Sequence, residues 1–531
     1  MKLKHKYLIA CIVFLTAWVF DQLFWNKNPG ISVPLFVLLY LVGLYFITVR
    51  LEGRHPATAS LWLVVPCLLF AVLEMVRLEP FTSFVNLVML AVCLLTITLS
   101  WLGGKWSSYS ISDWMVRSAT LAGLGLVGPL QVFLGEKDDS ESSEGTPTNS
   151  QAPVIRRTLA SVALGLVMAL PVVILLGALL AGADPVFGKQ LEEFLRYFSV
   201  DNLREYLVRF FIILVVGYAM LGTVLFSLLH TKDEKLIGLQ KPWLSPFLNG
   251  VSSGIVLLSI DILFLVFVIV QFQYFFGGQA NISYAGYTYS EYARRGFGEL
   301  VGVALISMVV FLSMAMFTRR LEGWKRHTFS ALGLVLVLLV GVMLVSAFQR
   351  LNLYETAYGF SRLRAYTSVF LVWLGILLAL TVVLQWSGRL RAFSLAVLLV
   401  GCGFALSLTV LNIDGFITRS NLSRAIVDHN LDTRYLINLS KDNVPDLFDV
   451  YLDPAVDSQI RKQTAIVLRC QQLREDPQAW PSFHFSHYRA QSLFGQYGSE
   501  LLQTGTPYKE RGLWHLLIDG DDISCQNFLI D

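Results

Sequence analysis

Four charged side chains stand immediately before an apolar run in the stretch YSEYARRGFGELVGV, residues 289–303. They are Glu291, Arg294, Arg295 and Glu299. If the stretch is helical, Arg295 lies four residues from both glutamates, so the charges can form a ladder of ion pairs. Arginine also binds carboxylate and phosphate groups, and glutamate can serve as a general base or a metal ligand. The stretch therefore predicts either a binding site or a structural clasp.

Two further segments carry charges at the ends of apolar runs. The segment LNLYETAYGFSRLRAYTSV contains Glu355, Arg362 and Arg364 among three tyrosines, and the segment ADPVF contains Asp184. Tyrosines and charges at such positions are typical of interfacial anchoring, with the charges paired for structure. The alternative is that these residues join those of 289–303 in one binding cluster. We expect all three segments to lie on the same side of a membrane.

Asp261 lies near the middle of the apolar run GVSSGIVLLSIDILFLVFVIVQF. At 100 degrees per residue, Gly250, Gly254 and Leu257 share its helix face, and the two glycines allow another helix to approach closely. Ionisable residues inside membrane spans often bind protons or ions. Asp261 is therefore a candidate coupling site, and the alternative is a protonated or hydrogen-bonded aspartate in a packed helix interface.

The composition indicates which kind of element must position these residues. Of 531 residues, 55% are hydrophobic and only 15% are charged, which exceeds the apolar content of soluble proteins. A membrane-spanning helix needs about 20 mostly apolar residues. We therefore predict an all-α polytopic membrane helical bundle of about eleven transmembrane helices with a small helical polar C-terminal domain. The predicted runs are 7–25, 32–49, 59–78, 81–102, 158–182, 207–229, 247–276, 300–318, 328–348, 366–386 and 392–413.

The distribution of lysine and arginine decides how one ambiguous segment is interpreted. Residues 112–135 are long enough to span but contain Asp113, Arg117 and Pro129. If they do not span, the short loops place Lys and Arg on the cytoplasmic side at roughly two to one. We therefore interpret this segment as interfacial or re-entrant, with the N-terminus cytoplasmic and the C-terminus outside. The predicted organisation is a four-span bundle at 1–110, an interfacial segment and acidic cytoplasmic linker at 111–157, a seven-span core at 158–413, and a polar helical domain at 414–531.

The C-terminal region after residue 413 has no spanning run and no basic patch, so we expect no nucleic-acid partner. An apolar stripe formed by Val456, Ile460, Thr464, Val467 and Cys470 predicts a packed helix after Pro454. Cys470 and Cys525 are the cysteines of this region, and an oxidising compartment would allow them to pair, but sequence cannot show the geometry. His484 and His487 lack an adjacent third ligand, so we predict surface or packing roles and neither metal nor cofactor.

Several motifs occur in the order ALLAGADPVF, YSEYARRGFGELV, LYETAYGFSRLRAY, LNIDGFITRSN and LDTRYLINLSKDNVPDL. From about residue 156 to the C-terminus, this series resembles a bacterial family of multi-pass membrane proteins known as a domain of unknown function, number four-one-seven-three. The resemblance implies a protein of the bacterial cytoplasmic membrane. It implies no reaction, ligand or catalytic residue.

Three classes of function stay open. The first is a scaffold, sensor or signalling component of the cell envelope with an outward-facing polar surface, whose C-terminal domain contacts envelope proteins. The second is a secondary transporter or channel that uses Asp261. The third is a membrane enzyme that acts on an anionic or lipid-linked substrate, which we favour least. The lipid bilayer is the one partner that the composition itself requires.

Overall fold

The computed structural model describes residues 3–134, 179–197, 203–232, 247–276, 297–318, 323–428, 431–474 and 477–525, with isolated positions between 169 and 177 and at 236. The chain forms two compact units. The first comprises Met1–Asn26, Leu39–His55 and Thr120–Leu229, and the second comprises Lys27–Leu38, Pro56–Ala119 and His230–Asp531.

The described residues contain ten helices that are long and apolar enough to cross a membrane. This confirms an all-α multi-pass membrane protein. All but one of these helices coincide with a predicted run, the exception being most of α6 (Ile111–Leu134). The predicted run 59–78 instead forms two short helices, α3 (Thr58–Trp62) and α4 (Val64–Glu74). The linker and most of the run 158–182 lie outside the described residues.

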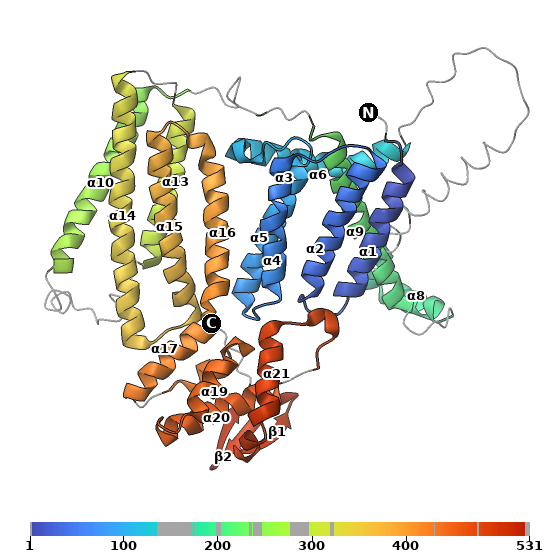
Figure 1. The fold of residues 1–531 in the computed structure, drawn as a ribbon, viewed down its shortest axis with the longest axis vertical. Coiled ribbons are helices and arrows are strands. Elements are labelled where there is room, and N and C mark those ends of the chain that lie inside the picture. Colours follow the sequence, from blue (N-terminus) through green and yellow to red (C-terminus); the bar gives the residue numbers. More distant parts are fainter. Residues whose placement is uncertain are drawn as a thin grey trace, which may run out of the picture. The chain divides into compact units, whose positions relative to one another are not determined.

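In the first unit, α1 (Lys6–Phe24) packs along α9 (Leu203–Leu229), and both are drawn in Figure 1. Near the end of α1, the buried Asp21 accepts hydrogen bonds from Arg209 on α9 at 2.6 and 2.9 Å. A Cβ on Gly222 of α9 would lie 2.3 Å from the carbonyl oxygen of Gly125 on α6, so this contact requires glycine. The unit also contains the second half of α2 (Ser32–Phe46) and α8 (Pro185–Tyr197).

In the second unit, spanning helices pack side by side in a row that can be followed in Figure 1. The helix α14 contacts α10, α13 and α15, while α16 lies between α15 and α5, and α5 also packs on α4. Two apolar clusters form the core of one end of this row, one of α10, α13 and α14 and one that also includes α15. The bounds are α5 (Pro80–Ser100), α10 (Gly250–Phe276), α13 (Phe297–Phe317), α14 (Trp324–Tyr358), α15 (Arg362–Trp386) and α16 (Phe393–Leu411).

Local sequence determines where several of these helices begin and end. Glu79 caps α5 by accepting hydrogen bonds from the backbone amides of Phe81 and Thr82, at 2.9 and 2.7 Å, and Pro80 occupies the first turn. Gly359 ends α14 with a φ of 78°, which favours glycine. Asn412 separates α16 from α17 (Ile413–Asp428) as a single left-handed residue with φ of 49°.

The C-terminal module, residues 413–525, packs around one apolar cluster. The predicted stripe is confirmed in part: Ile460, Thr464, Val467 and Cys470 are buried on α20, whereas the half-buried Val456 precedes this helix, which begins at Ser458 after an Asp457 cap. The module also contains a three-stranded antiparallel sheet in the order β1-β2-β3, which we did not predict from the sequence. Its elements are α18 (Thr433–Ile437), α19 (Val444–Leu452), α20 (Ser458–Leu473), α21 (Phe485–Tyr497), β1 (Thr506–Glu510), β2 (Leu513–Ile518) and β3 (Asp521–Ser524).

Candidate functional site

Most of the predicted charge ladder lies outside the described residues. Glu291, Arg294 and Arg295 lie outside the described residues, whereas Glu299 is exposed in the first turn of α13. Asp184 belongs to the first unit, where its carboxylate accepts hydrogen bonds from the backbone amides at the start of α8, at 2.8 and 3.4 Å. This contact gives Asp184 a helix-capping role.

The predicted loop 351–369 is instead the end of α14, a glycine turn and the start of α15. Arg364 donates to the carbonyl oxygen of Gly359 and lies 4.1 Å from the ring centre of Tyr354. Glu355 is buried and accepts a hydrogen bond from Ser368 at 3.2 Å. These contacts close the turn between two spanning helices, so both residues have structural partners.

Arg362 joins the spanning bundle to the C-terminal module. Its guanidinium donates two hydrogen bonds, of 2.8 and 2.6 Å, to the carboxylate of Asp414, whose side chain is fully buried. The backbone amide of Ser440 donates to the same carboxylate at 2.7 Å. Because paired donors of this kind match both oxygens of a carboxylate, the pair fixes the start of α15 against α17.

A second buried carboxylate, Asp442, continues this polar layer. It accepts hydrogen bonds from the backbone amide of Leu78 at 2.9 Å, from the hydroxyl of Ser440 at 2.7 Å, and from the hydroxyl of Ser486. Leu78 lies in the turn between α4 and α5, whereas both serines belong to the module. Asp442 therefore anchors the module on the ends of the spanning helices.

Backbone contacts extend the same docking surface. The backbone amide of Phe485 donates a hydrogen bond to the carbonyl oxygen of Met75 at 2.8 Å. The backbone amide of Ile31 donates one to the carbonyl oxygen of Phe483 at 3.1 Å. A Cβ on Gly30 would lie 2.7 Å from the Phe483 carbonyl oxygen, so the chain can pass here only with glycine. The turns before α2 and α5 thus both contact the start of α21.

A polar pocket of ≈ 270 Å³ opens where these parts meet. It is lined by the α4–α5 turn, the end of α16, α17, α19 and α21. Its cationic side chains are Arg77, Arg419, Lys441 and Arg489. Its acidic side chains are Asp442, Asp446 and Asp449. A concave site with convergent polar groups is the kind of place where small molecules bind.

The charges in this pocket act on one another. Arg77 is half-buried and donates its Nε hydrogen to the carbonyl oxygen of Thr409 at 3.0 Å. The pKa of Arg77 is lowered, chiefly by burial. The carboxylates of Asp442 and Asp446 act to raise this pKa, whereas Arg489 and Arg419 act to lower it. Arg419 contacts both oxygens of Asp446 at 3.0 Å. Arg77 therefore lies within electrostatic range of two aspartates and two other arginines of the pocket.

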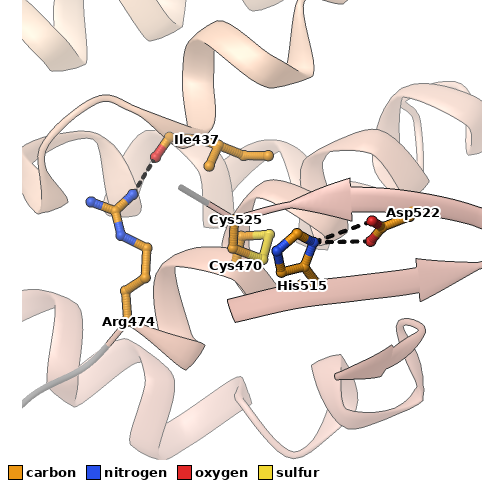
Figure 2. The surroundings of a disulfide bond; sticks show 6 residues. All are labelled: Ile437, Cys470, Arg474, His515, Asp522 and Cys525. Atoms are coloured by element: carbon orange, nitrogen blue, oxygen red, sulfur yellow. Dashed lines mark hydrogen bonds and ion pairs between the residues drawn. A yellow bond between two sulfur atoms is a disulfide. The ribbon is translucent and has the colours of Figure 1, made fainter. Parts of the chain in front are cut away.

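The module is also closed covalently. Cys470 of α20 and Cys525, just after β3, form a disulfide with a Cα–Cα distance of 5.0 Å, shown in Figure 2. Beside it, Arg474 donates to the carbonyl oxygen of Ile437 at 2.8 Å. The cysteine pairing that sequence left open is therefore present in the structure.

His484 and His487 lie at the start of α21. His484 and His487 are both buried, so they are packing and not surface residues. His487 accepts a hydrogen bond at Nδ1 from the ammonium group of Lys441, at 3.3 Å. Within the part of the chain that the structure describes, no group of three or more potential ligands is arranged to hold a metal ion.

Asp261 is buried on α10, the helix that packs along α14. The other predicted site residues divide between the two units or lie outside the described residues. The pocket itself was missed by the sequence prediction. A signal for it was present, because the motifs LNIDGFITRSN and LDTRYLINLSKDNVPDL contain Arg419, Asp442 and Asp446.

A family model described as domain of unknown function DUF4153 matches residues 64–450. The chain belongs to this family. The number four-one-seven-three expected from the motifs is therefore wrong, although the assignment to a family of unknown function is correct. The DUF4153 match begins upstream of the motifs and includes the pocket residues Arg77, Arg419 and Asp446. No curated protein and no solved structure matches the chain.

Proposed function

We propose that this integral membrane protein is a sensor of the cell envelope, and that the polar pocket binds a small solute carrying a carboxylate or phosphate group. The observation that carries this proposal is the convergence of Arg77, Arg419 and Arg489 in a pocket of ≈ 270 Å³. Arginine binds both kinds of anion through paired hydrogen bonds. The aspartates of the pocket would exclude large polyanions and favour a solute that also carries a positive group.

The placement of the pocket supports a signalling role. Arg77 comes from a turn between membrane helices, whereas Asp446 and Arg489 come from the C-terminal module. A solute held by both parts stabilises the docked arrangement, since it binds that state more tightly than a separated one. Occupancy would thereby change how firmly the module is attached. The module would pass this change to a protein partner in the envelope.

One observation supports placing the module outside the cytoplasm. The Cys470–Cys525 disulfide is typical of an oxidising compartment.

The binding proposal is tested with inorganic phosphate and glutamate as probes, on the full chain in lipid nanodiscs. We expect at least one probe to raise the thermal unfolding temperature in a saturable manner. Arg489→Gln should weaken its binding by about tenfold or more, because a hydrogen bond to a charged group contributes roughly 1.5–3 kcal/mol. Arg434→Gln, another exposed arginine of the module but outside the pocket lining, is the matched control.

Failure of both probes to bind the wild-type protein would overturn the proposed ligand chemistry. Equal weakening in Arg489→Gln and Arg434→Gln would assign the effect to surface charge alone. The orientation is tested separately with reporters fused after Asp531. Alkaline phosphatase should be active there and green fluorescent protein dark, and the opposite pattern would place the module in the cytoplasm.

A further inference from the structure

Asp261 is an unusual buried carboxyl group in the second unit. Its side chain is 4% exposed, and neither carboxylate oxygen has a hydrogen-bond partner among the described residues. It lies on α10, which packs along α14. One turn after Gly254 on the same face, Leu257 is fully buried, which shows that this face of α10 is turned into protein.

Apolar clusters lie on both sides of Asp261 along α10. One turn earlier, Leu257 belongs to a cluster with Phe311, Phe329 and Leu336. Two turns later, Val268 belongs to a cluster built from α13, α14 and α15. These facing helices have no ionisable residue in 300–317, 328–349 or 367–386, so none of these segments can supply a countercharge.

An ionised carboxylate without a partner is strongly disfavoured in such a place, because its hydration is lost and no hydrogen bond replaces it. The same group carrying a proton is neutral and can remain. A metal cation would require several oxygen ligands, and within the described part of the chain neither carboxylate oxygen of Asp261 has a polar contact that could belong to such a set.

We propose that Asp261 is a proton-binding site inside the spanning bundle. The proton is bound by one carboxylate oxygen, and its release leaves an anion that must find water or a donor. Release therefore requires α10 and α14 to separate, so protonation favours the packed arrangement of these two helices. This proposal does not depend on the solute pocket or on the orientation of the C-terminal module.

The test uses dicyclohexylcarbodiimide on the full chain in native membranes, followed by mass spectrometry of peptides. This hydrophobic reagent reacts with protonated carboxyl groups in apolar surroundings and converts them to an N-acylurea. Asp414 is a matched internal reference, since it is also buried but paired with Arg362. We expect the Asp261 peptide to be labelled while the Asp414 peptide stays unlabelled. A water-soluble carbodiimide should label neither.

Two results would overturn the proposal. Absence of label on the Asp261 peptide would show that the carboxyl group is ionised, because the neighbouring Ile262 and Leu263 are exposed and bring this part of α10 within reach of a membrane-soluble reagent. Protection of Asp261 by sodium or potassium ions would assign the site to a metal cation. Both readouts use the wild-type protein, so they do not depend on a variant that folds. Asp261→Asn serves only to confirm the mass assignment.

Discussion

Replacing Arg362 by methionine is the sharpest test of how the module is held. The change leaves the carboxylate of Asp414 fully buried, with the Ser440 amide as its remaining donor among the contacts described above. Removing one partner of a buried ion pair costs about 3–5 kcal/mol, because the other charge stays desolvated. We expect the free energy of unfolding of the second unit to fall by that amount.

The matched control is Arg419→Gln, which breaks a more exposed pair. The side chain of Arg419 is 52% exposed, compared with 28% for Arg362, and its partner Asp446 is 15% exposed. Exposed ion pairs contribute only about 0.2–1 kcal/mol. The free energies of unfolding of the two variants should therefore differ by several kcal/mol, although each variant removes one arginine that contacts one aspartate.

The assay is denaturant unfolding of the full chain in mixed micelles, with cleavage of the C-terminal module by a protease as a second readout. Adding Asp414→Asn to Arg362→Met should recover most of the loss, since a neutral amide is less costly to bury than a charge. A loss in Arg362→Met within about 1 kcal/mol of that in Arg419→Gln would refute the reasoning, because the buried pair would then behave like a surface pair.

Two further predictions concern the module. The Cys470–Cys525 disulfide closes a loop of 55 residues, so its reduction should lower the module's free energy of unfolding by about 4 kcal/mol on the chain-entropy estimate. Alkylation followed by mass spectrometry verifies the reduction. Protease resistance that reductant leaves unchanged would contradict the prediction. Burial lowers the pKa of His487 from 6.5 to about 4, with Lys441 and His484 acting in the same direction. The folded module thus binds fewer protons, so stability present above pH 6.5 should be lost as the pH falls toward 4. Between pH 6.5 and 4, the free energy of unfolding should depend less on pH in His487→Gln than in the wild-type protein. An equal dependence on pH in the two proteins would show that His487 does not contribute.

The small sheet could have been predicted from the sequence. Arg511 and Gly512 connect β1 to β2, and Asp519 and Gly520 connect β2 to β3, all four with positive φ. A two-residue turn ending in glycine between strand-forming residues is a strong hairpin signal. The expectation of a purely helical tail overlooked it, because the caps and stripes of the preceding segments had indicated helices.

The positions of most spanning helices follow from sequence alone, because crossing a hydrocarbon layer requires a minimum length of apolar residues whatever the neighbours are. Helix ends at Glu79 and Gly359 are likewise local, since capping and positive φ involve adjacent residues. Only the tertiary structure determined which residues, distant in the sequence, pair with each other. The hydrogen bond between Arg362 and Asp414 joins residues 52 positions apart in the sequence, and that between Leu78 and Asp442 joins residues 364 positions apart. No periodicity encodes such contacts, because they depend on how helices and turns are placed in three dimensions. The sequence shows which residues are charged. Only the fold brings Arg77 of the α4–α5 turn together with Asp446 and Arg489 of the C-terminal module around a pocket.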